Sequence, residues 1–172
     1  MKNAFLIHGA YGSSHENWIP WLQAKLAEDG FAVTVPEFPT PEGQNYANWM
    51  KVVEPRLSEF NEETILVGHS IGAAFALCVL EALDVQIAKT ILVSGFIGSL
   101  DNEAFDSINH TIAEREFAWP RIKANSKNFH IVHGLDDPDV PMTKAQELSE
   151  ILEVPVIKIP NGGHLNEEAG FN

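Results

Sequence analysis

One stretch constrains the fold more than any other: residues 65–74 read I-L-V-G-H-S-I-G-A-A. The β-branched and apolar residues at its start predict a buried strand, and the small and apolar residues at its end predict a helix. Between them, a G-x-S-x-G pattern places Ser70 between Gly68 and Gly72. Glycine at both positions permits a sharp, strained turn with the serine at its tip. The stretch therefore predicts a strand, a tight turn and a helix that expose the Ser70 hydroxyl at the edge of a sheet.

Strands and helices alternate along the rest of the chain. Apolar runs predict strands over residues 3–8, 31–35, 64–67, 90–93, 129–133 and 154–159. Apolar residues at helical spacing predict helices over about 15–29, 43–60, 71–83 and 142–152. We therefore expect an α/β three-layer sandwich with a mainly parallel six-stranded sheet of order 2-1-3-4-5-6. The ligand site should lie at the carboxyl ends of the strands, where the strand-free segment 94–127 is expected to cover it.

Composition bears on the number of domains and on the class of partner. The 172 residues suit one domain, residues 1–172. A formal charge of −13, from 24 acidic and 11 basic residues, disfavours nucleic acids and anionic membranes as partners, and nothing indicates a protein partner. The first apolar run, residues 4–7, is too short for a signal-peptide core or a membrane span. Cys78 is the only cysteine, so we expect a buried structural thiol in a reducing, cytoplasmic protein.

An acid and a histidine follow the serine in the order that nucleophilic catalysis on such a sheet requires. The strand at 129–133 runs into H-G-L-D-D-P-D-V-P, and the strand at 154–159 runs into P-N-G-G-H, which ends at His164. The pattern G-x-x-D-x-x-V-P favours Asp137 as the acid, with Asp136 as the alternative. Ser70, Asp137 and His164 are therefore the candidate catalytic residues.

Other polar residues near these strand ends have different interpretations. A calcium site at Asp136, Asp137 and Asp139 is disfavoured, because the loop lacks further oxygen ligands and a distal glutamate, so no metal is expected. His69 and His133 are interpreted as packing or hydrogen-bonding residues. The remaining histidines considered are interpreted as surface or structural residues: His15, His110 and His130.

Backbone amides near Ser70 could stabilise an oxyanion. The amide of Ile71 lies at the predicted helix start and points towards the space around Ser70. The loop after the first strand reads H-G-A-Y-G over residues 8–12, and a second amide is expected there from Ala10 or Tyr11.

These motifs together resemble the α/β-hydrolase fold, and more narrowly the small serine hydrolases grouped with human retinoblastoma-binding protein nine. The resemblance covers nearly the whole chain: the H-G loop with Trp18 and Trp21 behind it, the G-H-S-I-G turn, the D-D-P-D-V-P loop and the G-G-H loop. It implies a compact fold without a large cap domain, and a triad of Ser70, Asp137 and His164. Chains of that family begin at the strand carrying H-G, which accounts for the short length.

The expected activity is hydrolysis of a small ester, thioester or amide through an acyl-enzyme, with no cofactor. Without a large cap the pocket should be small and open, and should favour short acyl chains. The residues expected to line it are Tyr11, Phe96, Ile97 and Trp119. The alternatives are a weakly active or non-catalytic interaction protein that retains the fold, and perhydrolysis by the same triad. The intact serine, aspartate and histidine favour the hydrolase.

Overall fold

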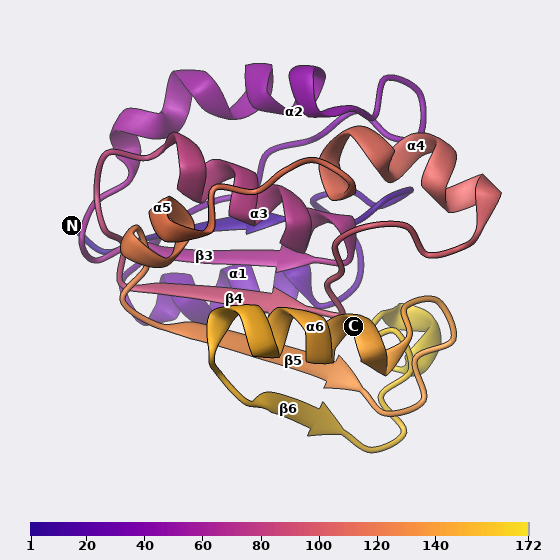
Figure 1. Ribbon diagram of the computed structural model, residues 1–172. Helices are drawn as coiled ribbons and strands as arrows, with labels where there is room; N and C mark the ends of the chain where they lie inside the picture. The colour runs from indigo at the N-terminus through magenta and orange to yellow at the C-terminus, as the bar shows by residue number, and fades with distance from the viewer. Residues whose placement is uncertain (172) are drawn as a thin grey trace.

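A six-stranded parallel sheet forms the centre of the computed structural model, which describes residues 1–171 (Figure 1). The strands are β1 (Asn3–Ile7), β2 (Ala32–Thr34), β3 (Ile65–His69), β4 (Lys89–Val93), β5 (Phe129–Gly134) and β6 (Val156–Ile159). Their order is β2-β1-β3-β4-β5-β6, and every neighbouring pair is parallel. The predicted fold class and strand order are therefore confirmed.

Helices cover both faces of the sheet and complete the three layers. Most lie on one face: α2 (Tyr46–Val53), α3 (Ile71–Ala82), α4 (Glu103–Ala113), α5 (Trp119–Ala124) and α6 (Met142–Leu152). The other face is covered by α1 (Ile19–Glu28) (Figure 1). Residues 71–80 of α3 are all buried, as expected for a helix that is apolar nearly all round. Cys78 is buried in this helix, and burial raises the pKa of its thiol to about 12.

Two predicted helices are shorter than their apolar spacing indicates. The helix predicted over 15–29 begins at Ile19, because residues 15–18 form a loop in which Asn17 has a φ of 55°. The helix predicted over 43–60 is α2 followed by a 3-10 segment, Glu54–Glu59. Pro55 lacks an amide hydrogen and cannot continue an α-helical ladder at this point. No helix within residues 1–171 is long and apolar enough to span a bilayer.

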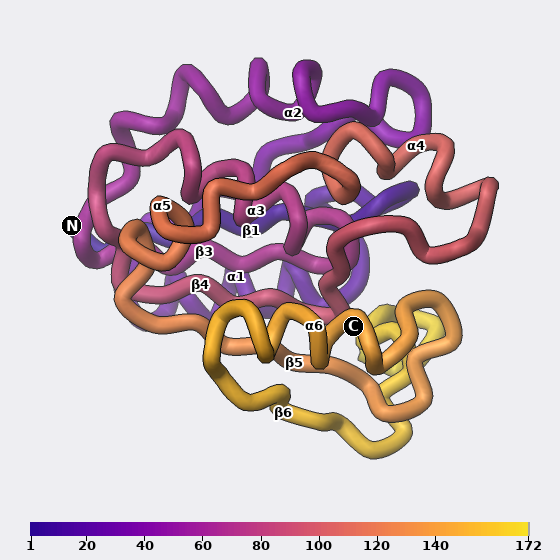
Figure 2. The backbone as a smooth tube through the Cα atoms, in the orientation of Figure 1, coloured from indigo at the N-terminus to yellow at the C-terminus, as the bar shows by residue number. Residues whose placement is uncertain are grey.

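The carboxyl ends of the strands meet at one edge of the sheet. Residues Leu66 and Val67 of β3 lie beside Phe5 and Leu6 of β1, and β4 and β5 continue the same register. Because all strands are parallel, the loops that follow them lie on the same side of the molecule (Figure 2). The loops after β1, β3, β5 and β6 carry every candidate catalytic residue.

Candidate active site

Ser70 occupies the turn between β3 and α3 in a strained backbone conformation, with φ 56° and ψ −125°. The two flanking glycines are required by close packing. A Cβ on Gly68 would overlap the backbone of Gly72, and a Cβ on Gly72 would lie 2.5 Å from the carbonyl oxygen of His8. The sharp turn predicted from G-x-S-x-G is therefore present, and it leaves Ser70 partly exposed.

His164, in the loop after β6, contacts Asp137, in the loop after β5. The Nδ1 atom of His164 lies 3.0 Å from Oδ1 and 2.9 Å from Oδ2 of Asp137. The exposed fractions of the two side chains are 10% and 1%. Asp136 instead accepts a hydrogen bond from the backbone amide of Gly163 at 3.1 Å. Of the two aspartates left open by the sequence, the structure brings Asp137 to the imidazole.

The environment of Asp137 keeps its carboxylate ionised. Burial alone would raise its pKa, but hydrogen bonds from His164 and from the amides of Val140 and Asp139 outweigh burial and lower the pKa. Both amides lie 2.9 Å from Oδ1. Nε2 of the buried His133 lies 3.6 Å from Oδ2 and 2.9 Å from the carbonyl oxygen of Val140. A charged carboxylate held in this way accepts a hydrogen bond from Nδ1–H of His164 and thereby fixes the imidazole tautomer.

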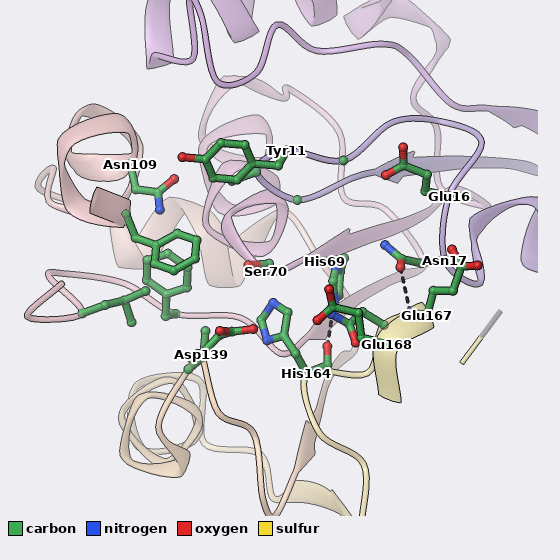
Figure 3. Close-up of a pocket in the computed structure, with 18 residues that line it drawn as sticks. Tyr11, Glu16, Asn17, His69, Ser70, Asn109, Asp139, His164, Glu167 and Glu168 are labelled. Carbon is green, nitrogen blue, oxygen red and sulfur yellow. Dashed lines mark hydrogen bonds between the residues drawn. The ribbon is translucent and has the colours of Figure 1, made fainter. Parts of the chain in front are cut away.

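Ser70 and His164 border the same pocket, whose volume is about 410 Å³ (Figure 3). Within residues 1–171, no hydrogen bond joins the Ser70 hydroxyl to His164. In free enzymes such bonds are often long and tighten when substrate binds. Apolar side chains border part of the pocket: Phe96, Leu100 and Phe105. Figure 3 shows Tyr11 and Asn109 on one side of Ser70, and the carboxylates of Glu16, Glu167 and Glu168 on the other.

Of the four residues expected to line the pocket, Tyr11 and Phe96 border the pocket beside Ser70, whereas Ile97 and Trp119 do not. The last two residues border a separate hollow, beside Phe117 and the carboxyl end of α4. Ile97 is 7% exposed and packs into the core. Trp119 begins α5, which leads into β5 and lies near the amino ends of the strands (Figure 1). Segment 94–127 therefore reaches the site through α4 and the loop that precedes it, but not through α5.

The two amides expected to act as oxyanion donors in the loop after β1 differ in their hydrogen-bond partners. The amide of Tyr11 donates to Oγ1 of Thr40 at 2.7 Å, and among residues 1–171 the amide of Ala10 has no acceptor. His8 shapes this loop, because its Nδ1 donates to the Gly9 carbonyl at 2.8 Å while its Nε2 accepts from the amide of Phe38 at 3.0 Å. Of the two donors considered from sequence, Tyr11 is engaged elsewhere and Ala10 remains. Ile71 begins α3 directly after Ser70.

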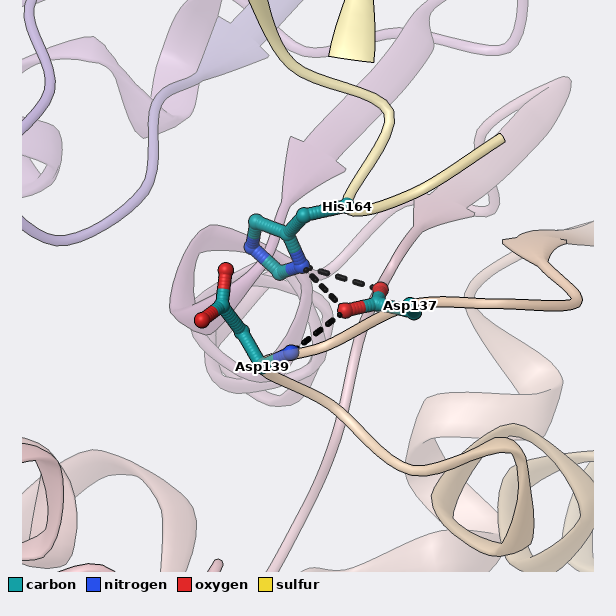
Figure 4. A group of neighbouring side chains, drawn as sticks. All are labelled: Asp137, Asp139 and His164. Atoms are coloured by element: carbon teal, nitrogen blue, oxygen red, sulfur yellow. Dashed lines mark hydrogen bonds and ion pairs between the residues drawn. The ribbon is translucent and has the colours of Figure 1, made fainter. Parts of the chain in front are cut away.

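The Asp139 side chain lies near those of His164 and Asp137, so that two carboxylates and one imidazole lie close together (Figure 4). One potential ligand atom from each of the three residues lies within 4.8 Å of the others. Both Asp137 oxygens already accept hydrogen bonds from His164, and Oδ1 accepts two more from backbone amides. A metal ion would have to displace these bonds, so the donor set fits an orienting contact for His164 better than a metal centre.

Comparisons with known proteins identify the family. The serine hydrolase family model matches residues 4–172. The chain belongs to the serine hydrolase family. It is 30% identical over 173 residues to the hydrolase YdeN of Bacillus subtilis, with 99% of this chain and 89% of YdeN covered. It is 29% identical over 148 residues to the serine hydrolase RBBP9 of Rattus norvegicus, with 86% of this chain and 77% of the relative covered.

A solved structure agrees with this assignment. The crystal structure of the ydeN gene product of B. subtilis superposes with a TM-score of 0.91 at 28% identity, and the match covers 99% of this chain and 91% of that one. The resemblance inferred from the motifs is therefore confirmed at the level of family and fold.

Two residues of this serine hydrolase contact the His164 loop in a way that the sequence did not predict. Nε2 of His69 lies 3.0 Å from the carbonyl oxygen of His164. Nε1 of Trp18 donates to the carbonyl oxygen of Leu165 at 2.8 Å. His69 was expected to pack or to form hydrogen bonds, but its partner lies 95 residues away and no spacing reveals it.

We expect the stability of this serine hydrolase to fall in mild acid because of His69. Burial, and then the nearby His164, lower the pKa of His69 from 6.5 to about 4. The folded state therefore favours the neutral imidazole. Above pH 6.5, His69 is neutral in both the folded and the unfolded protein. As the pH falls from 6.5 towards 4, His69 is protonated mainly in the unfolded protein, so the free energy of unfolding decreases. Between pH 7 and pH 4.5 this loss should be about 2 to 3 kcal/mol.

Urea denaturation at the two pH values measures this change against His69→Gln, which cannot titrate. The variant should lose about 2 kcal/mol less free energy of unfolding than the wild type over this pH range. Equal losses in the two proteins would show that His69 does not contribute.

Proposed function

We propose that this serine hydrolase cleaves a small ester, thioester or amide by acyl transfer, with Ser70 as nucleophile, His164 as general base and Asp137 as the residue that orients it. One observation carries the proposal: the His164–Asp137 hydrogen-bonded pair and the strained Ser70 border a single pocket. The order of the three residues in the chain is the one that this fold uses.

The proposed mechanism gives each of the three side chains one role. Nε2 of His164 takes the hydroxyl proton as Oγ of Ser70 bonds to the substrate carbonyl carbon, and Asp137 stabilises the imidazolium that forms. The imidazolium then gives its proton to the leaving oxygen, sulfur or nitrogen, which leaves an acyl-serine. His164 next takes a proton from water, whose oxygen attacks the acyl carbon, and returns that proton to Ser70.

The oxyanion formed in each step needs two donors. We assign them to the amides of Ile71 and Ala10, because Ile71 begins α3 and Ala10 has no other acceptor among the described residues. Such backbone donors stabilise the negative charge that develops on the substrate oxygen, and each contributes about 3 to 4 kcal/mol to transition-state binding.

Turnover of p-nitrophenyl butyrate tests the proposal. We expect steady hydrolysis preceded by a burst of nitrophenol, since the ester forms an acyl-enzyme that water then releases. A folded protein that shows neither a burst nor turnover with this ester or its thioester analogue would favour the interaction-protein alternative.

Acyl chain length tests the shape of the pocket. A pocket of about 410 Å³ bordered by Phe96, Leu100 and Phe105 should accept short acyl groups and leave a long chain partly in water. We expect kcat/KM for p-nitrophenyl butyrate to exceed that for the palmitate by about tenfold or more. Assays over a chain series below the micelle threshold measure this ratio, and equal or faster turnover of the palmitate would contradict it.

A further inference from the structure

The backbone around His164 has an uncommon conformation. Gly163 and Leu165 both have φ near 50°, in the left-handed region that a leucine rarely adopts. Such a conformation persists only where surrounding contacts determine it. The contacts that hold this loop therefore also determine where the imidazole of His164 lies.

His69 supplies one of these contacts from the end of β3. Its side chain is 4% exposed, its ring centroid lies 4.9 Å from that of His164, and its Nε2 lies 3.0 Å from the His164 carbonyl oxygen. Because a carbonyl oxygen only accepts, Nε2 of His69 must carry the proton. The residue before the nucleophile thus donates directly to the backbone of the residue that would activate it.

Trp18 supplies the second contact from the start of α1. Its indole Nε1 donates to the Leu165 carbonyl at 2.8 Å, across 147 residues of sequence. The neighbouring Asn17 accepts from the amide of Glu167 at 2.8 Å, so the loop before α1 is joined to this segment at two points. The Trp18 and His69 rings also pack at nearly a right angle, with their centroids 5.7 Å apart.

We propose that Trp18 and His69 are positioning residues that fix the loop carrying His164 by donating to two consecutive carbonyl groups of its backbone. The proposal rests on the proposed function, since it assigns these contacts to the placement of the general base. His69 borders the pocket, whereas Trp18 does not, and the Trp18 indole N–H donates to the Leu165 carbonyl. Losing its hydrogen bond should therefore slow the chemical step and leave substrate binding unchanged.

Trp18→Phe removes the indole N–H and keeps an aromatic ring against His69. Trp21→Phe is the matched control, because Trp21 lies in the first turn of α1, three residues after Trp18, and is 56% exposed. At the second contact, His69→Leu removes the donor, whereas His69→Gln retains a side-chain N–H that can reach the same carbonyl.

With p-nitrophenyl butyrate, Trp18→Phe and His69→Leu should each lower kcat about 10- to 100-fold. In Trp18→Phe, whose altered side chain lies outside the pocket, KM should stay within about twofold of the wild type. Trp21→Phe should match the wild type, and His69→Gln should recover part of the loss. Because both contacts act on one loop, the double variant should lose less than the product of the single losses.

Proton NMR reports on the loop without turnover. The Nδ1 proton of His164, shared with Asp137, should give a far-downfield signal in the wild type and in Trp21→Phe. Its loss in Asp137→Asn assigns it. The signal should broaden or shift in Trp18→Phe and in His69→Leu.

The outcomes separate the two proposals. A downfield signal that responds to Trp18→Phe in a protein without esterase activity would reject the proposed function and keep the positioning role. A Trp18→Phe variant with wild-type kcat and an unchanged downfield signal would overturn the positioning role, even if its thermal midpoint falls.

Discussion

Ser70→Ala lowers kcat for p-nitrophenyl butyrate by about 10⁴- to 10⁶-fold while the protein stays folded. The variant lacks the atom that bonds to the acyl group, so only the oxyanion donors and substrate binding remain to assist attack by water. The substitution should not disturb the strained turn, because alanine is smaller than serine and introduces no new steric clash. Steady-state assays and thermal melts of the two proteins measure both parts of the prediction.

Ser94→Ala is the matched control for this variant. Ser94 follows the neighbouring strand β4, has a φ of 46°, and its buried hydroxyl has no hydrogen-bond partner among residues 1–171. Its replacement should leave kcat within about twofold, since no reacting atom is removed. More than a tenth of wild-type turnover in Ser70→Ala, free of contaminating esterase, would contradict the assignment of the nucleophile.

Asp137→Asn should lower kcat about 10³- to 10⁴-fold, because an amide neither stabilises the imidazolium nor selects the tautomer with the proton on Nδ1. The substitution should change kcat more than KM, since the Asp137 side chain is only 1% exposed and does not line the pocket. Initial rates over a range of ester concentrations separate the two constants.

Asp136→Asn tests whether Asp136, rather than Asp137, is the acid that orients His164. Asp136 is exposed and accepts from the Gly163 amide, and asparagine keeps an oxygen for that bond. We expect a loss below about tenfold. If Asp136→Asn were the more damaging of the two, the acid would have been assigned to the wrong residue.

The elements that position the site follow from local sequence. Glycine is needed at 68 and 72 because backbone atoms pass within contact distance of both, and this need is visible as G-x-S-x-G between an apolar run and a helix. The alternation of strands and helices likewise predicts the parallel sheet. A parallel sheet places the loops of Ser70, Asp137 and His164 at one edge.

The finer assignments depend on contacts between distant segments. The proposed preference for Ala10 over Tyr11 as oxyanion donor depends on Thr40, whose Oγ1 accepts a hydrogen bond from the Tyr11 amide across 29 residues of sequence. Within segment 94–127, hydrophobicity alone does not separate Phe96, which borders the pocket beside Ser70, from Ile97 and Trp119, which border a separate hollow. Apolar residues in such a segment fit a core as well as a pocket.

The proposed roles of Trp18 and His69 also depend on contacts between segments that are distant in sequence. Each reads in the sequence as a residue that packs, and each does pack, but the ring nitrogens also reach carbonyl groups in a loop that is 95 or more residues away. Asp136 and Asp137 are adjacent in sequence, and only the backbone of their loop decides which carboxylate faces the imidazole.

Labelling with a fluorophosphonate tests the central claim, that Ser70 is an activated nucleophile. The probe phosphonylates serine hydroxyls that a neighbouring base activates, so the wild type should gain one probe mass, and peptide mapping should place it on Ser70. Labelling should vanish in Ser70→Ala and slow strongly in His164→Ala. A folded wild-type protein that gains no mass, or that carries the probe on another residue, would contradict the account.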